Sequence, residues 1–197
     1  MIDFPEGLPL TAEPMFMPRD VEQRSLTGPT DVFPRLGGRF AIQVSAGPFY
    51  AEEARELLAL VMAAKYGGEG LRMRYPLQWS QDGGGATRIN GAITGPTRTL
   101  PIKGGTPGFV IRRGWFTSVQ DASGNHFFHS IATGARIAND GTAIVTVTPE
   151  LKAPFPDNTV VNIAVPRIQG LVTDAQIAWP ISGDKVAPVV FTLEEQR

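Results

Sequence analysis

The segment that decides the fold opens with RFAIQVS, residues 39–45. Its apolar residues, Phe40, Ile42 and Val44, alternate with polar or smaller ones, which is the two-residue period of a strand that buries one face. A helical period follows at once, and alternation returns in LRMRYPL, residues 71–77. The sequence therefore predicts a strand, a helix and a second strand in direct succession.

The helix is predicted over residues 51–66 of AEEARELLALVMAAKYGG. Glu52 and Glu53 in its first turn and Lys65 in its last turn suit the helix dipole, and the glycine pair at 67–68 ends it. Apolar residues recur with helical spacing and form one stripe, which we expect to cover a sheet face. The stripe consists of Ala54, Leu57, Leu58, Val61 and Met62.

The later part of the chain is predicted to be rich in strands. SQDGGGATRINGAITGPT, residues 80–97, is predicted to be a flexible loop, because its glycines match no phosphate-binding motif and no helix follows them. From about residue 100, short alternating segments separated by Gly or Pro indicate a β-sandwich or small barrel. These segments are FVIRR (109–113), WFTSV (115–119), HFFHSIA (126–132), AIVTVTP (143–149), TVVNIAV (159–165), LVTDAQIAW (171–179) and APVVFTL (187–193).

The first 30 residues contain five prolines. Proline removes backbone donors and prevents a long helix, so we predict an extended, irregular arm with at most one short strand. Such an arm is stable only where it lies on its own domain or on a neighbouring molecule.

Composition narrows the class of protein. The chain has 197 residues, a formal net charge of −1 and no cysteine. The near-neutral charge gives no sign of a nucleic-acid binder, and disulfides and thiolate metal sites are excluded. No apolar run approaches the roughly 20 residues that span a bilayer, and no signal peptide is recognisable. We expect a soluble protein made in the cytoplasm.

The only histidines, His126 and His129, lie in SGNHFFHSIATG, residues 123–134. On a regular strand, side chains separated by an odd number of residues project to opposite faces, so these two histidines cannot bind one metal ion together. DASGN, residues 121–125, before them is typical of a turn. We interpret the segment as one strand of a hairpin whose return strand is AIVTVTP.

No catalytic constellation is recognisable. Glu52, Glu53, Glu56 and Asp121 are the notable carboxylates, but the three glutamates fall on the polar face of the helix, and the separation and burial that define a glycosidase pair are not visible in a sequence. The GxSxG motif of serine hydrolases is absent. No catalytic, cofactor-binding or metal-binding residue is assigned.

Basic residues occur in two pairs, Arg72 with Arg74 and Arg112 with Arg113. The first pair shares one face of a predicted strand, where it can meet an acidic neighbour or a partner subunit. Without interleaved aromatic residues, neither pair indicates nucleic-acid binding.

The order of these segments resembles that of the distal tail proteins of long-tailed phages and phage-derived particles. RDVEQRSLTGPTDVFPRLGGRF, residues 19–40, is similar to the opening of that family, with Phe40 where the family usually has tryptophan. The strand–helix–strand run at 40–78, the segment 123–166 and the closing strand 187–193 continue the resemblance. These motifs are structural and carry no catalytic residues.

The resemblance implies two domains. An N-terminal belt domain over residues 1–100, a β-sandwich or split barrel with one helix and an extended arm, would be completed by a returning strand within 168–197. A smaller barrel-like outer β domain would occupy residues 101–167. The fold class is therefore expected to be mainly β.

The resemblance also implies a function in the virion. The protein would be a non-enzymatic structural adaptor at the tail tip, forming a homo-oligomeric, hexameric ring between the tail tube protein and the tail hub or baseplate protein. DNA would pass through the lumen without specific binding, and no membrane would be involved. We expect Asp and Glu to outnumber Lys and Arg on the lumenal wall, because a basic bore would retain phosphates.

An alternative is a carbohydrate-binding or glycan-hydrolysing β-protein that acts at the host cell surface. It would need an exposed aromatic platform on the outer domain. The candidates are Trp115, Phe116, Phe127 and Phe128. Alternation on a strand places one residue of each adjacent pair in the core.

Overall fold

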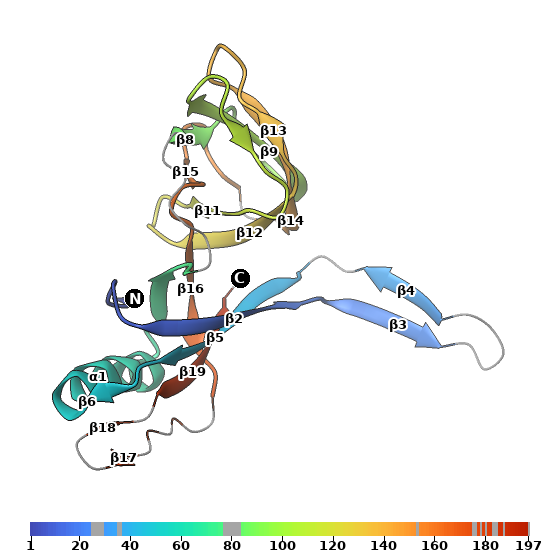
Figure 1. Ribbon diagram of the computed structural model, residues 1–197. Helices are drawn as coiled ribbons and strands as arrows, with labels where there is room; N and C mark the ends of the chain where they lie inside the picture. The colour runs from blue at the N-terminus through green and yellow to red at the C-terminus, as the bar shows by residue number, and fades with distance from the viewer. Residues whose placement is uncertain are drawn as a thin grey trace.

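The computed structural model describes residues 1–24, 30–34, 37–76, 84–152, 154–174, 177, 179, 181–182, 185–186 and 188–196. Across these residues the chain is mainly β with one helix, which confirms the predicted fold class. A sheet with the helix occupies the lower half of Figure 1, and a barrel occupies the upper half.

The lower part is built on a six-stranded sheet. Phe40, Ile42 and Val44 are buried in it, as their alternation predicts. The closing strand is also observed and pairs antiparallel with the strand that contains these residues. In spatial order the strands are β1 (Ile2–Asp3), β7 (Leu71–Arg74), β16 (Arg167–Val172), β19 (Val189–Glu195), β5 (Arg39–Ala46) and β2 (Leu10–Met17).

The helix α1 (Ala51–Gly67) packs its apolar stripe into the core of this sheet. Leu57, Leu58 and Val61 are buried, and burial of each contributes about 1.5–3 kcal/mol. Met62, predicted to belong to the stripe, is half-buried at its margin. The Glu53 carboxylate accepts a hydrogen bond from the Tyr50 backbone N–H at the start of the helix (3.4 Å).

The upper part is a closed barrel of six strands. Four of them lie in the strands predicted in WFTSV, HFFHSIA, AIVTVTP and TVVNIAV, and those of HFFHSIA and AIVTVTP pair antiparallel as the predicted hairpin. The barrel encloses its own apolar core, separate from that of the sheet. In order around the barrel the strands are β11 (Phe116–Gln120), β12 (His126–Thr133), β14 (Ala143–Leu151), β9 (Thr97–Gly105), β8 (Gly85–Ile89) and β15 (Val160–Asn162).

The prediction of a loop at residues 80–97 is wrong at residues 85–89, where β8 lies, whereas residues 90–96 belong to no helix or strand. The domain boundary expected at 100–101 falls inside β9, so the barrel begins at Gly85. Gly85 has a φ of +73°, and a Cβ there would lie 2.8 Å from the Gly104 carbonyl oxygen. Glycine is needed for this close approach of two strands. Residues 77–83 lie outside the described residues.

Other predicted strands are shorter or shifted. LVTDAQIAW does not continue as a strand, since β16 ends at Val172 and the Asp174 carboxylate then accepts hydrogen bonds from the N–H and hydroxyl of Thr192. Residues 175, 176 and 178 lie outside the described part. Two small sheets complete the fold: β10 (Val110–Ile111) with β13 (Ala135–Arg136), and β17 (Ile181–Ser182) with β18 (Lys185–Val186) and β6 (Phe49–Tyr50).

The N-terminal arm is more regular than the sequence predicts. Residues 10–17 form β2, which pairs with β5 along its whole length. The chain then continues into a hairpin of β3 (Asp20–Arg24) and β4 (Thr30–Pro34), which projects away from the body to the right in Figure 1. Residues 25–29 and 35–36 lie outside the described residues.

Aromatic side chains join the sheet to the barrel. Phe40 of β5 packs edge-on against Phe128 of β12 (5.2 Å between ring centroids) and against Phe116 of β11 (5.9 Å). Phe116 and Phe128 stack at 5.1 Å, and Tyr75, which follows β7, contacts both. This cluster is contiguous with the core of the sheet, so the barrel is packed onto the sheet by apolar contacts.

A buried carboxylate accepts hydrogen bonds from both sides of the same joint. The side chain of Glu195, at the end of β19, is 1% exposed. One of its oxygens accepts from the backbone N–H of Phe128 in the barrel (2.8 Å), and the other accepts from the N–H of Phe40 in the sheet (3.3 Å). Buried backbone donors need acceptors, and here one side chain supplies them to both parts of the molecule.

We predict that Glu195→Ala lowers the free energy of unfolding by roughly 2–5 kcal/mol, because two buried N–H groups lose their acceptor. Glu195→Gln keeps one acceptor oxygen and costs less. Urea unfolding measures both. The matched control is Glu194→Gln, whose ion pair with Arg39 lies at the surface and contributes about 1 kcal/mol at most. Equal effects of Glu195→Ala and the control would contradict this role.

Candidate functional site

Both histidines are structural parts of β12. Phe128, two residues from His126, packs in the sheet core, whereas Ile131, two residues from His129, packs in the barrel core. The two imidazoles therefore project to opposite faces of the strand, as predicted. His129 Nδ1 lies 2.8 Å from the Pro149 carbonyl oxygen. Within the described ranges, no three His, Asp or Glu side chains are grouped so that they could hold a metal ion.

The notable carboxylates do not come together. Glu52, Glu53 and Glu56 are exposed on α1. Asp121 shapes the turn before β12, where its carboxylate accepts hydrogen bonds from the N–H of Ser123 (2.9 Å) and of Asn125 (2.8 Å). These hydrogen bonds stabilise the turn, so the role of Asp121 is structural and local.

The four aromatic residues proposed as a sugar platform do not form one. Phe128 is fully buried, and Phe116 is stacked on it within the joint. Trp115 and Phe127 are half-buried and pack against the barrel core. The expectation of an exposed platform at these residues is therefore wrong. In each adjacent pair one ring packs in the joint and the other packs against the barrel core.

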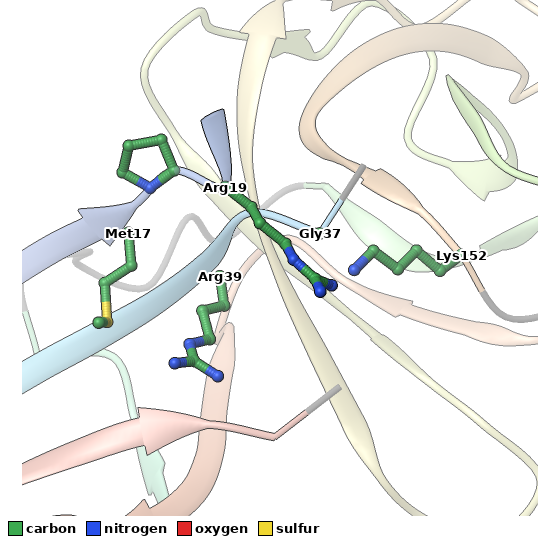
Figure 2. A pocket seen from close by; sticks show the side chains of 6 residues that line it. Met17, Arg19, Gly37, Arg39 and Lys152 are labelled. Carbon is green, nitrogen blue, oxygen red and sulfur yellow. The ribbon is translucent and has the colours of Figure 1, made fainter. Parts of the chain in front are cut away.

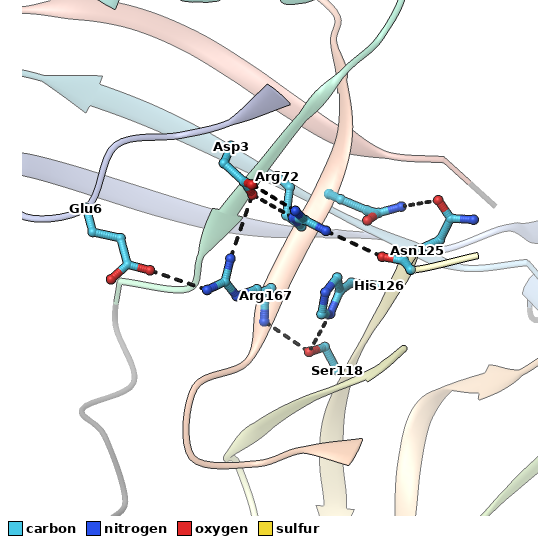
Figure 3. A network of polar contacts seen from close by, with 9 residues as sticks. Asp3, Glu6, Arg72, Ser118, Asn125, His126 and Arg167 are labelled. Atoms are coloured by element: carbon cyan, nitrogen blue, oxygen red, sulfur yellow. Dashed lines mark hydrogen bonds and ion pairs between the residues drawn. The ribbon is translucent and has the colours of Figure 1, made fainter. Parts of the chain in front are cut away.

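A polar network borders the aromatic joint on the sheet side (Figure 3). The Arg72 guanidinium donates to both carboxylate oxygens of Asp3 (2.6 and 2.8 Å) and reaches the Gly124 carbonyl oxygen (3.5 Å). The hydrogen bonds from Arg72 hold the pKa of Asp3 below its usual range. Of the two alternatives for the face of Arg72 and Arg74, an acidic neighbour or a partner subunit, Arg72 meets the first within the same chain.

His126 lies inside this network. Its Nδ1 is 3.4 Å from the Ser118 hydroxyl oxygen, which accepts from the Arg167 backbone N–H (3.0 Å). Burial, reinforced by the positive charges of Arg72 and Arg167, lowers the pKa of His126 to about 4. The imidazole is therefore neutral at pH 7 and becomes charged only in acid.

An open strand edge is the main unpartnered feature of the sheet. Among the described residues, β2 pairs with β5 on one side and with no strand on the other. Next to this edge lie the exposed side chains of Met15, Phe16 and Met17, which are 38%, 45% and 38% exposed. Free strand edges with apolar neighbours are templates for pairing with another chain.

Pro14 limits what this edge can pair with. Gly47 N–H donates to the Pro9 carbonyl oxygen (2.9 Å), and residues 9 and 47 continue the register of the β2–β5 ladder. Because hydrogen-bonded and non-hydrogen-bonded pairs alternate in an antiparallel ladder, Pro14 stands in a non-hydrogen-bonded pair with Ile42. Its nitrogen thus faces the open edge and offers no donor there, whereas the N–H of Ala12 faces the same edge and is available.

Cationic side chains gather where the β3–β4 hairpin leaves the body (Figure 2). Gly37 has a φ of +127°, and a Cβ there would lie 3.0 Å from Arg19 Cδ and 3.1 Å from Lys152 Nζ. The Gly37 N–H donates to Glu150 Oε1 (2.9 Å). The cavity they border, about 400 Å³, is lined by Met17, Pro18, Arg19, Gly37, Arg39 and Lys152, and Arg39 is paired with Glu194.

Sequence reasoning did not find Glu195, Lys152 or the donor-free position at Pro14. One signal was present: in VVFTLEE, Glu195 occupies the same alternation as Val189, Phe191 and Leu193, which are all buried. A charged residue at a core position indicates a buried contact. Nothing in the sequence places Lys152 beside the hairpin, because that proximity depends on how the barrel packs.

Comparisons of this chain with protein-family models and with characterised proteins found no match. In the part of the chain that the structure describes, no helix has the length and apolar character needed to cross a membrane.

The pKa of His126 predicts acid sensitivity. Its folded-state pKa of about 4 lies below its ordinary value of 6.5, so the unfolded chain binds the proton first and stability falls as the pH drops between these values. Thermal unfolding of wild type and His126→Gln from pH 7 to pH 4 measures the effect. The wild type should lose more stability than the variant over this window; parallel curves would contradict the assignment.

Proposed function

We propose that this chain is a structural protein that closes into a ring with copies of itself, as the distal tail adaptor of a long-tailed phage or phage-derived particle. The observation that carries the proposal is the open edge of β2, which leads directly into the projecting β3–β4 hairpin. In this role a ring of six copies joins the tail tube protein to the tail hub or baseplate protein and leaves a channel for DNA.

The strand edge supports assembly in a ring. When one surface of a subunit binds a different surface of the next, rotation either closes a ring or produces a filament. Backbone N–H and C=O groups on the β2 edge gain partners when a strand of the next copy lies beside them. Because Pro14 has no backbone donor, a strand of another copy can pair with the β2 edge in fewer registers. This restriction favours one specific contact over unrestricted edge-to-edge pairing.

The joint supports a rigid subunit. The aromatic cluster and Glu195 fix the barrel on the sheet, so both parts keep one orientation around a ring.

Two substitutions at one residue test the strand-edge contact. Ala12→Pro removes a donor that faces the open edge and leaves the β2–β5 hydrogen bonds in place, whereas Ala12→Val keeps the donor. In mass photometry, wild type and Ala12→Val should give a species near six times the 21.2 kDa of one chain. Ala12→Pro should give mainly monomer with an unfolding temperature close to that of wild type.

Two outcomes would count against the proposal. A wild type that remains monomeric at its highest soluble concentration would show that this edge does not drive self-assembly. A ring that forms equally well with Ala12→Pro would show that the contact lies elsewhere on the chain.

A further inference from the structure

The charges of the chain are unevenly distributed between its two parts. Residues 85–166, from the start of β8 to the residue before β16, include the barrel and carry seven Lys or Arg and four Asp or Glu. The rest of the chain carries eleven Lys or Arg and fifteen Asp or Glu. The formal net charge is therefore +3 for the barrel and −4 for the remainder, so an extended negative surface attracts the barrel and repels the remainder.

Three exposed arginines of the barrel lie near one another. Arg112 and Arg113 follow β10, and Arg136 ends β13, the strand that pairs with β10. A Cβ on Gly134 would lie 3.1 Å from the Arg112 carbonyl carbon and 3.0 Å from the Arg113 nitrogen, so the two segments are in close contact. Among the described residues, no carboxylate forms an ion pair with any of these arginines.

Exposed aliphatic side chains lie on both sides of Arg136. Val110, its partner in the β10–β13 ladder, is 48% exposed, and Ile144 at the start of β14 is 66% exposed. Their chain neighbours Ile111 and Val145 are buried in the barrel core. Because side chains alternate along a strand, Val110 and Ile144 project outward.

The turn between β13 and β14 aligns Ile144 with Arg136. The Ala138 N–H donates to the Thr142 carbonyl oxygen (2.8 Å), and two residues further along each strand are Arg136 and Ile144. Residues that lie opposite each other on one face of an antiparallel pair have Cβ atoms about 4.5–5.5 Å apart. Val110, Arg136 and Ile144 therefore form a row across β10, β13 and β14. Together with Arg112 and Arg113, this row is the cationic face.

We propose that the cationic face binds the surface of an anionic lipid bilayer. Its guanidinium groups pair with lipid phosphates, and its two aliphatic side chains enter the boundary between head groups and acyl chains. A soluble anion would leave Val110 and Ile144 exposed, and an uncharged apolar partner would bury the arginines without a counter-charge. An acidic protein patch matches the face alone, whereas an extended anionic plane also repels the remainder of the chain and so favours this orientation.

This contact is independent of the ring. In Figure 1, β13 lies in the upper part of the barrel, away from the open edge of β2. Binding through the cationic face is peripheral, with no segment that crosses the bilayer. It departs from the expectation, implied by the resemblance, that no membrane is involved.

The test is sedimentation of the full chain with vesicles of phosphatidylcholine, alone or mixed with phosphatidylglycerol. The wild type should sediment with the mixed vesicles in a salt-sensitive manner and should not sediment with phosphatidylcholine alone. Arg136→Gln should weaken binding about fivefold, because one cation near an anionic surface contributes about this factor. The matched control, Arg55→Gln on the exposed side of α1, should leave binding almost unchanged.

A second set of variants tests the aliphatic side chains. Val110→Thr combined with Ile144→Thr keeps β-branched residues on both strands and should weaken binding about tenfold, because less apolar surface enters the lipid. The matched control is Val190→Thr, which changes a valine of β19 that is 40% exposed. This control should bind as the wild type does.

Four results would overturn the proposal. They are no sedimentation with the anionic vesicles, equal binding by Arg136→Gln and Arg55→Gln, full binding by the double threonine variant, or binding of soluble polyphosphate or polyglutamate as tight as that of the vesicles. If Arg136→Gln fails to fold, Arg112→Gln combined with Arg113→Gln replaces it, with a larger expected loss. The ring is measured separately by mass photometry, so the failure of either proposal can be recognised without the other.

Discussion

The structure depends on the joint where Glu195 and four aromatic rings hold the barrel against the sheet. Burial of a carboxylate is costly unless hydrogen bonds compensate for its lost hydration. Here the donors are backbone N–H groups of Phe40 and Phe128, one on each side of the joint. The same residues supply the apolar contacts, so packing and hydrogen bonding stabilise one relative orientation of sheet and barrel.

The sequence predicted the elements whose periodicity was strong. The strand at 39–45 and the helix at 51–66 were identified because their apolar residues recur with a clear period, and opposite projection of His126 and His129 followed from strand geometry alone. Strands rich in glycine or proline were not identified. Gly85 suggested a loop, although it permits close packing of two strands in the barrel. Pro14 suggested an irregular arm, although it occupies a position of an edge strand that needs no backbone donor.

The residues that make up the joint and the candidate surfaces could not be found from local patterns. Gln169 lies 44 residues from Asn125, its partner, and Gly37 lies 113 residues from Glu150. Such contacts depend on how the returning strands β16 and β19 bring the end of the chain back into the sheet. The resemblance implied one returning strand within 168–197, but the residues that this return brings into contact were not visible in the sequence.

A rigid body with an open strand edge at β2 is suited to repeated, identical contacts. The edge of β2 offers backbone groups that need partners, and the joint keeps the barrel in a constant position relative to that edge. Negative-stain imaging of the purified protein tests this account most directly. It predicts closed rings of identical two-part subunits around a central channel, whereas fields of single two-part particles would contradict it.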